Sequence, residues 1–211
     1  MFPTKEEWLK ALENRQGKEI LEKFQKATVA ICGLGGLGSN IAISLARAGI
    51  GKLILIDFDK VDVSNLHRQQ YKMNQIGMFK TEALISILKE ISPYTKYEIF
   101  TTKISEDNYM DLLKEADVIC EAFDNPEAKA MLVNNVLEHL PESYLVAASG
   151  MAGMDTPNII KTRNIMKHFY LCGDEKNDVN NSGSLISARV MLCASHEALT
   201  VLRIIAEKYE V

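Results

Sequence analysis

Short apolar runs alternate with longer stretches of helical spacing along this chain. The apolar runs contain five or six residues, a length typical of buried parallel strands and too short for a helix. They cover residues 28–32, 52–57, 117–122 and 144–149. Weaker strand patterns cover residues 97–101 and 158–172, the second as one strand or a hairpin. Helical spacing of apolar positions covers residues 5–25, 39–48, 79–91, 106–115, 125–139 and 184–208.

This alternation predicts an α/β fold. We expect a Rossmann-like, mostly parallel sheet with helices on both faces, N-terminal helices and a C-terminal helix. Residues 28–57 contain a strand, a glycine loop, a helix and a second strand, in the order of a right-handed βαβ unit. Residues 58–76 are polar and long for a connection in a compact domain, and such loops are often functional. Because the sequence shows no linker or repeat, one domain over residues 1–211 accounts for the whole chain.

Composition and charge narrow the functional classes. The 211 residues are 47% hydrophobic and 25% charged, which are ordinary values for a soluble protein. A net charge of −4 argues against nucleic acid or an anionic membrane as a partner. No stretch approaches the roughly 20 apolar residues of a membrane helix, and the N-terminus lacks the features of a signal peptide. We therefore expect a cytoplasmic protein.

A glycine-rich loop at residues 33–38 follows the first apolar run and opens a helix. Its glycines are Gly33, Gly35, Gly36 and Gly38. Glycine allows a tight turn and lets backbone N–H groups approach a phosphate at the helix N-terminus. Asp57 ends the next strand, where a carboxylate can bind a ribose hydroxyl. The combination favours a nucleotide site over a purely structural turn, but it does not distinguish NAD from ATP.

Candidate ligands for phosphates lie outside this loop, which lacks the G-K-[ST] ending of a P-loop. Arg68 can bind a phosphate with two parallel N–H donors, and Asn65 can donate an amide proton. Lys80 opens a predicted helix and can reach back to the nucleotide, and Arg15 precedes the first strand. Any one of them alone is better explained as a solvated surface residue. Their arrangement around the glycine loop favours a role in binding.

Asp124 lies at the C-terminal end of a predicted central strand, the edge where open α/β sheets bind ligands. A carboxylate at this edge can hold Mg²⁺, which prefers one or two carboxylates together with phosphate oxygens. The alternative is an ordinary helix cap before Pro126, because Asp and Asn favour that position. The residue types leave both interpretations open.

Together these residues resemble the ThiF/MoeB/ubiquitin-activating-enzyme superfamily. The matching segments are Arg15-Gln16, residues 33–38, 55–59, 64–69 and 77–80, and Asp124-Asn125. They follow one another in the family's order. Residues 170–174 and 183–190 further resemble the short ThiF subtype of thiamine biosynthesis, the adenylyltransferase that acts on the sulfur carrier protein ThiS.

The resemblance implies a nucleotidyltransferase that uses ATP and Mg²⁺. Its substrate would be the C-terminal glycine carboxylate of a small ubiquitin-like sulfur carrier protein ending in Gly-Gly, with pyrophosphate released. The resemblance implies that Asp57 holds the ribose, that Asp124 binds Mg²⁺ and that Arg15 reaches the phosphates in a neighbouring subunit, as in a homodimer. The triphosphate and the rest of the nucleotide would be held by Asn65, Arg68, Lys80, Asp59 and Gln69.

The cysteines mark two departures from the longer members of this superfamily. Those members carry two C-x-x-C pairs that bind zinc, whereas this chain has none, so we predict no zinc. Longer members also carry a cysteine that bonds to the carrier, and Cys172, in a polar, loop-like context, is the candidate for such a reactive thiol. Cys32, Cys120 and Cys193 lie in apolar runs and are expected in the core.

Three other functions use the same features. An NAD-binding oxidoreductase or redox sensor would use the βαβ unit but leave Asn65, Arg68 and Lys80 without a role. A non-catalytic scaffold would bind a carrier without activating it. A related enzyme would activate a different carrier, for molybdopterin. The sequence identifies neither the carrier nor the sulfur donor, and it does not show whether a covalent cysteine intermediate forms.

Overall fold

The computed structural model describes residues 3–177 and 183–211 of the chain. Within them the strands form one seven-stranded sheet in the order β3-β2-β1-β4-β5-β7-β6. All neighbours pair in parallel except β6 and β7, which form the antiparallel hairpin that the sequence allowed. The strands are β1 (Thr28–Cys32), β2 (Lys52–Ile56), β3 (Lys96–Phe100), β4 (Val118–Glu121), β5 (Tyr144–Ala148), β6 (Lys161–Met166) and β7 (Phe169–Gly173). The predicted Rossmann-like α/β fold is confirmed.

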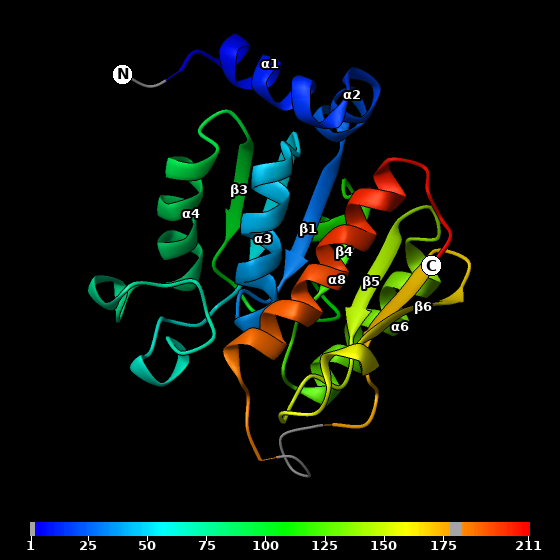
Figure 1. Cartoon of the computed structure of the whole chain (residues 1–211). Helices are drawn as coiled ribbons and strands as arrows, with labels where there is room; N and C mark the ends of the chain where they lie inside the picture. Colours follow the sequence, from blue (N-terminus) through cyan, green and yellow to red (C-terminus); the bar gives the residue numbers. More distant parts are fainter. Residues whose placement is uncertain (1–2, 178–182) are drawn as a thin grey trace.

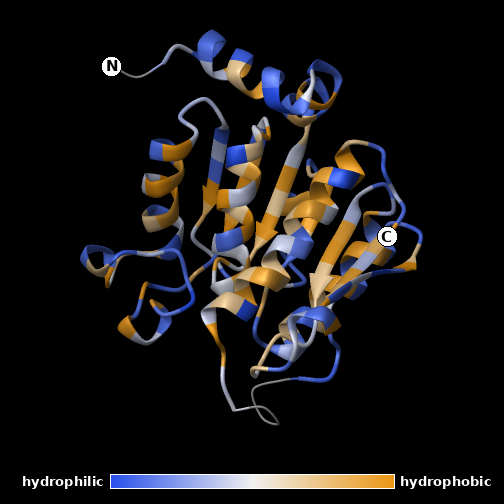
Figure 2. Ribbon diagram, viewed as in Figure 1, coloured by the Kyte–Doolittle hydropathy of each residue, from blue (hydrophilic) through white to orange (hydrophobic). Residues whose placement is uncertain are grey.

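Helices cover both faces of the sheet (Figure 1). One face packs against α3 (Gly36–Ala48), α4 (Lys80–Ile91) and α8 (Ser187–Ile205), and the other against α5 (Tyr109–Leu113) and α6 (Pro126–His139). Because successive strand side chains point to opposite faces, alternate residues of the central strands enter the two hydrophobic clusters. Figure 2 shows the apolar residues concentrated in the strands and along the sides of the helices that face them.

The N-terminal helices α1 (Lys5–Gln16) and α2 (Lys18–Lys26) lie beyond the N-terminal ends of the strands, at the top of Figure 1. Hydrogen bonds from side chain and backbone hold α2 there. Gln25 donates a hydrogen bond of 2.6 Å from Nε2 to the carbonyl of Gly49, and the Gly51 N–H donates to the Phe24 carbonyl at 2.9 Å. This end of the sheet is opposite to the edge that the glycine loop occupies.

Two irregular segments complete the fold. Residues 58–79 include the short 3₁₀ turns η1 (Val63–Asn65) and η2 (Met73–Gln75), and a third, η3 (Pro157–Ile159), precedes β6. The helix predicted over residues 106–115 is shorter than expected, because the side chain of Asn108 bonds to the backbone of Ser105 and Lys103 and holds a turn there. None of the helices in the described residues has both the length and the apolar character needed to cross a bilayer.

Candidate active site

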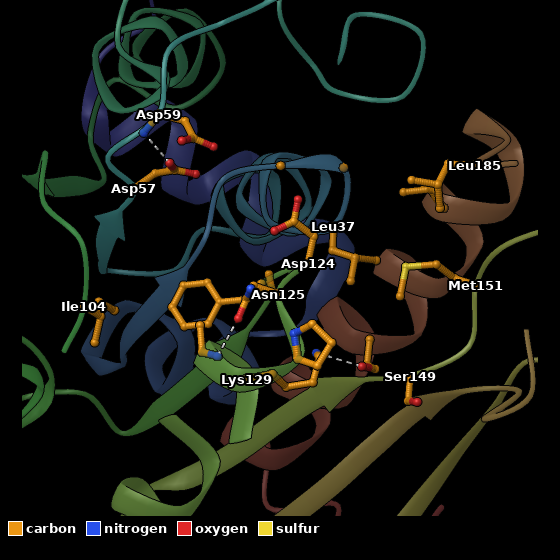
Figure 3. Close-up of a pocket in the computed structure, with 18 of the residues that line it drawn as sticks. Leu37, Asp57, Asp59, Ile104, Asp124, Asn125, Lys129, Ser149, Met151 and Leu185 are labelled. Carbon is orange, nitrogen blue, oxygen red and sulfur yellow. Dashed lines mark hydrogen bonds between the residues drawn. The ribbon is translucent and has the colours of Figure 1, made fainter. Parts of the chain in front are cut away.

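A cavity of about 1050 Å³ opens at the C-terminal ends of the parallel strands (Figure 3). The chain leaves β1 for β2 on one side and later returns to β4 on the other, so β1 and β4 form the switch point where open α/β sheets bind ligands. The sheet order therefore places groups along this edge in the sequence Asp57, glycine loop, Asp124 and Ser149. The predicted site residues that line the cavity are Gly35, Gly36, Asp57, Asp59, Asn65, Arg68, Gln69, Lys80 and Asp124.

The glycine loop is packed too tightly for side chains at three positions; a Cβ on Gly36 would lie 2.9 Å from Val190 Cγ1, and the other two positions meet backbone. Gly33 has a φ of +93°, and a Cβ there would lie 2.8 Å from the carbonyl oxygen of Ala122, the residue after β4. A Cβ on Gly38 would lie 1.8 Å from the Gly33 carbonyl oxygen. Within the described residues no side chain caps α3, whose N-cap is Gly35. The first N–H groups of this helix are therefore available to an anionic ligand.

Asp57 and Lys80 form a buried polar pair beside the loop. The two carboxylate oxygens of Asp57 accept hydrogen bonds from the Leu34 N–H at 2.6 Å and the Asp59 N–H at 2.8 Å. Lys80 Nζ lies 2.7 Å from Asp59 Oδ2 and 3.8 Å from Asp57 Oδ2. The Tyr71 hydroxyl donates to the Leu34 carbonyl at 2.7 Å, and burial, aided by Asp57, raises the pKa of Tyr71. The loop, the acid and the lysine are thus fixed relative to one another.

Arg68 crosses the start of α3. A Cβ on Gly36 would lie 3.4 Å from Arg68 Cγ. The aliphatic part of the arginine side chain therefore packs against the N-terminus of α3. Its guanidinium makes two long contacts of 3.4 Å, to the Ser64 carbonyl and to His67 Nε2. Burial lowers the pKa of Arg68, and the nearby Asp124 carboxylate opposes this effect. The guanidinium therefore has donors to spare for an anion in the cavity.

Gln69 and Asn65 come from the same polar segment. Gln69 is buried, and its Oε1 has no hydrogen-bond partner among the described residues. Asn65 is half-buried at the end of η1, and its amide makes a long contact of 3.4 Å with the Ser64 hydroxyl. Both side chains lie at the cavity with unused hydrogen-bonding capacity, as expected of ligand-binding groups.

The structure separates the two interpretations of Asp124. Asn125 caps α6, because its side-chain oxygen accepts a hydrogen bond of 2.8 Å from the Ala128 N–H, and Pro126 occupies the first helical position. Asp124 is not needed for that role and lies exposed in the cavity wall. Among the described residues no group of three or more acidic, histidine or cysteine side chains could hold a metal. The expectation that zinc is not bound stays a prediction.

Arg15 lies outside the cavity. It occupies the last turn of α1 and is exposed, at the end of the sheet opposite to the glycine loop. The structure therefore does not bring Arg15 together with the other predicted site residues of the same chain.

The loop-like surroundings predicted for Cys172 are wrong. Cys172 lies in β7 with its side chain fully buried, 3.5 Å from the Thr162 hydroxyl and 3.9 Å from the Thr200 hydroxyl. Burial, aided by Glu197, raises the pKa of its thiol to about 12. Because the thiolate is the nucleophile, this environment argues against a reactive cysteine. The core positions expected for Cys32, Cys120 and Cys193 are confirmed.

Sequence reasoning missed Lys129, which lines the cavity from α6. Its ammonium forms an ion pair with Glu121 and donates a hydrogen bond of 3.0 Å to the Ala148 carbonyl. The sequence signal that could have indicated Lys129 is Glu121, a glutamate inside the apolar run 117–122. A carboxylate that is fully buried needs a cation nearby. Residues 148–152 also line the cavity and come from a segment with no motif, whereas residues 185 and 190 lie in the segment 183–190 that carried part of the family resemblance but no predicted site residue.

Comparisons with known proteins identify the family of the chain. Residues 10–211 match the model of the ThiF family. The chain is 35% identical over 128 residues to adenylyltransferase and sulfurtransferase UBA4 of Kluyveromyces lactis, covering 60% of this chain and 29% of UBA4. It is 36% identical over 149 residues to ubiquitin-like modifier-activating enzyme 5 of Xenopus laevis, covering 65% and 37%. The chain thus spans about a third of the length of these relatives.

Two solved structures show the same fold. The Escherichia coli tRNA N6-threonylcarbamoyladenosine dehydratase TcdA in complex with ATP has a TM-score of 0.85 at 20% identity, covering 99% of this chain and 98% of TcdA. E. coli MccB with ATP has a TM-score of 0.70 at 21% identity, covering 91% and 59%. At these identities the likeness concerns the fold alone. The match over residues 10–211 decides the family: this chain belongs to the ThiF family.

Proposed function

We propose that this protein is an ATP-dependent adenylyltransferase that acts on the C-terminal glycine carboxylate of a ubiquitin-like sulfur carrier protein ending in Gly-Gly, of the type used in thiazole synthesis for thiamine. One observation carries the proposal: Arg68, Lys80 and Asp124 surround an uncapped helix N-terminus in one cavity. The names of the UBA4 and modifier-activating relatives support it, as do the ATP complexes of TcdA and MccB.

The reaction joins two anions. One carboxylate oxygen of the carrier bonds to the α-phosphorus of ATP, while the bond from that phosphorus to the bridging oxygen breaks. Pyrophosphate leaves with the electron pair, and the carrier becomes an acyl-adenylate. A carboxylate is ionised at neutral pH, so no general base is needed. Catalysis must therefore come from charge neutralisation and from positioning.

The cavity residues suit this task. Asp57 would bind the ribose, and the N–H groups at the start of α3 together with Arg68 and Lys80 would hold the phosphates. An exposed carboxylate beside a phosphate site is a donor that Mg²⁺ accepts, so Asp124 fits the ion. When bound, Mg²⁺ would neutralise charge on the phosphate oxygens. The remaining polar residues, Asp59, Asn65 and Gln69, would contact the nucleotide.

The position of Arg15 extends the proposal to a homodimer. Because Arg15 lies at the opposite end of the sheet from the cavity of its own chain, it can serve only the cavity of a neighbouring molecule. Each of the two sites of a dimer would then be completed by the other subunit. A cytoplasmic location and the absence of nucleic-acid and membrane partners stay predictions from composition.

Mass spectrometry tests the proposed function directly. The protein is mixed with Mg·ATP and with thiamine-type and molybdopterin-type carriers ending in Gly-Gly, and each carrier is examined for the gain of one AMP. We expect adenylation of the thiamine-type carrier. Adenylation of only the molybdopterin type would reassign the carrier, and carrier binding without adenylation would indicate a scaffold. Parallel titrations that show NAD binding without Mg·ATP binding would favour the oxidoreductase.

A further inference from the structure

The cavity has two ends with different surroundings. Its nucleotide half lies at the ends of β1 and β2, between the glycine loop and Asp57. What we call the acyl half lies beyond Asp124, over β4 and β5, and is lined by residues 124–129, 131, 148–152, 177, 185 and 190. If the ribose is bound at Asp57 and the phosphates at the glycine loop, the carrier carboxylate must approach from the acyl half.

Lys129 is the single cation among the described residues that line the acyl half. In Figure 3 it lies on the same side of the cavity as Asn125 and Ser149. Its side chain is 29% exposed, whereas its partner Glu121 is fully buried and does not line the cavity. The lysine is thus the member of this ion pair that a ligand can touch.

The ammonium of Lys129 is held in place by two acceptors. It donates to Glu121 Oε2 and to the Ala148 carbonyl at 3.0 Å. An ammonium has three N–H donors, so one donor is left for the cavity. The other oxygen of Glu121 accepts from the Phe123 N–H at 2.8 Å, which fixes the carboxylate in turn. This cation is therefore oriented before any ligand arrives.

We propose that Lys129 binds the C-terminal carboxylate of the carrier and positions it for attack on the α-phosphate. The inference rests on the proposed function and names the residue that recognises the nucleophile. A lysine that holds one carboxylate oxygen leaves the other free to bond to phosphorus, and orientation of this kind lowers the barrier of a reaction between two bound groups. Lys129 is then a catalytic residue, in addition to a partner for Glu121.

The test must separate these two roles. Changing Lys129 alone to an apolar residue would leave Glu121 buried without its cation, so the two variants of the main comparison share a change at Glu121. Glu121→Gln keeps the ammonium, and Glu121→Gln with Lys129→Met removes both charges. Lys129→Gln, whose amide can still donate to Glu121, provides a second comparison if the double variant fails to fold, and Tm values show which variants are folded.

The probe is a Gly-Gly carrier that supports ATP–pyrophosphate exchange by the unaltered enzyme, together with the same carrier bearing a C-terminal amide. We compare the double variant with Glu121→Gln. The Kd of the carrier with a free C-terminal carboxylate (the acid carrier) should be at least about tenfold higher for the double variant, the effect of losing one hydrogen bond to a charged group. The Kd values of the amide carrier and of Mg·ATP should change by less than about twofold.

Each other outcome overturns a specific statement. Equal weakening of the acid and amide carriers, or no weakening of either, would refute carboxylate binding by Lys129 while leaving the proposed function intact. Absence of exchange by the unaltered enzyme with every Gly-Gly carrier would instead refute the proposed function, and the inference about Lys129 with it.

Discussion

The two halves of the cavity are built in different ways. In the nucleotide half, the tight glycine loop, the two N–H bonds to Asp57 and the Lys80–Asp59 pair fix the groups through backbone and buried charge. In the acyl half, the walls come from segments far apart in sequence and include the apolar side chains of Met151 and Leu185. A nucleotide half of this kind suits one unvarying ligand, whereas the acyl half can change with the substrate without disturbing the nucleotide.

Removing the carboxylate of Asp124, which lies at the boundary of the two halves, should have the largest effect on activity. We expect Asp124→Ala and Asp124→Asn to lower carrier-dependent ATP–pyrophosphate exchange by a factor on the order of 10²–10³ or more, because charge stabilisation of the transition state is lost. Asn125 caps α6, so Tm should stay close to that of the unaltered protein. Undiminished exchange by a folded Asp124→Ala protein would remove the metal-binding role.

A pair of alanine substitutions tests the rigidity of the nucleotide half. Gly38→Ala places a methyl group 1.8 Å from the Gly33 carbonyl oxygen, so the loop must move. We expect a loss of about 1–3 kcal/mol in the free energy of unfolding and loss of Mg·ATP binding. Gly35→Ala is the matched control, since its nearest neighbour would be Gln69 Nε2 at 3.7 Å.

The control has its own expected result. Gly35→Ala should have a free energy of unfolding close to that of the unaltered protein. It should bind Mg·ATP more weakly, because the added methyl group lies where a phosphate approaches. Equal stability of both variants in urea unfolding would show that the loop is not tightly packed. Unchanged Mg·ATP affinity of Gly35→Ala would place the phosphates elsewhere.

Arg15 is a predicted site residue that belongs to neither half of the cavity of its own chain. Mixed dimers of Arg15→Ala and Asp124→Ala subunits contain one site with both native residues. If subunits exchange freely, about a quarter of the activity of the unaltered enzyme should return. Exchange assays on the mixture, with mixed dimers demonstrated by mass, measure this recovery. Mixed dimers without activity would argue against action across subunits.

The sequence predicted the nucleotide half much better than the acyl half, for a physical reason. The glycine loop, Asp57 and Lys80 lie within one stretch of about fifty residues, where the order of elements determines which groups meet. Lys129 acquires its role only when α6 packs beside β4 and β5, which no local pattern states. Cys172 ends the strand pattern predicted over residues 158–172, and the polar residues after it suggested a loop; pairing of β7 with both β5 and β6 instead buries its side chain.

The smallest predicted effect is on the pH dependence of stability and concerns Glu197, which lies on α8 in the core. It is fully buried, and neither carboxylate oxygen has a hydrogen-bond partner among the described residues. Burial raises its pKa well above the usual value; Lys129 opposes the rise and Glu121 adds to it. The nucleotide half contains a buried acid as well, but the oxygens of Asp57 are satisfied by N–H donors. The core near the Lys129–Glu121 pair therefore differs from the nucleotide half in containing a buried acid, Glu197, whose carboxylate oxygens accept no hydrogen bond among the described residues.

This difference gives a pH dependence with a definite sign. Because the folded state binds the Glu197 proton more tightly than the unfolded state, the stabilisation is present below the unfolded pKa near 4.5 and is lost as pH rises through the folded pKa. Glu197→Gln cannot titrate, so its free energy of unfolding should match that of the unaltered protein near pH 4.5 and exceed it by a margin that grows as the pH rises towards 7. Urea unfolding from pH 4.5 to 8 measures the difference, with the exposed Glu210→Gln as the charge-matched control. A gain that does not vary with pH would show that Glu197 is not protonated more readily in the folded protein.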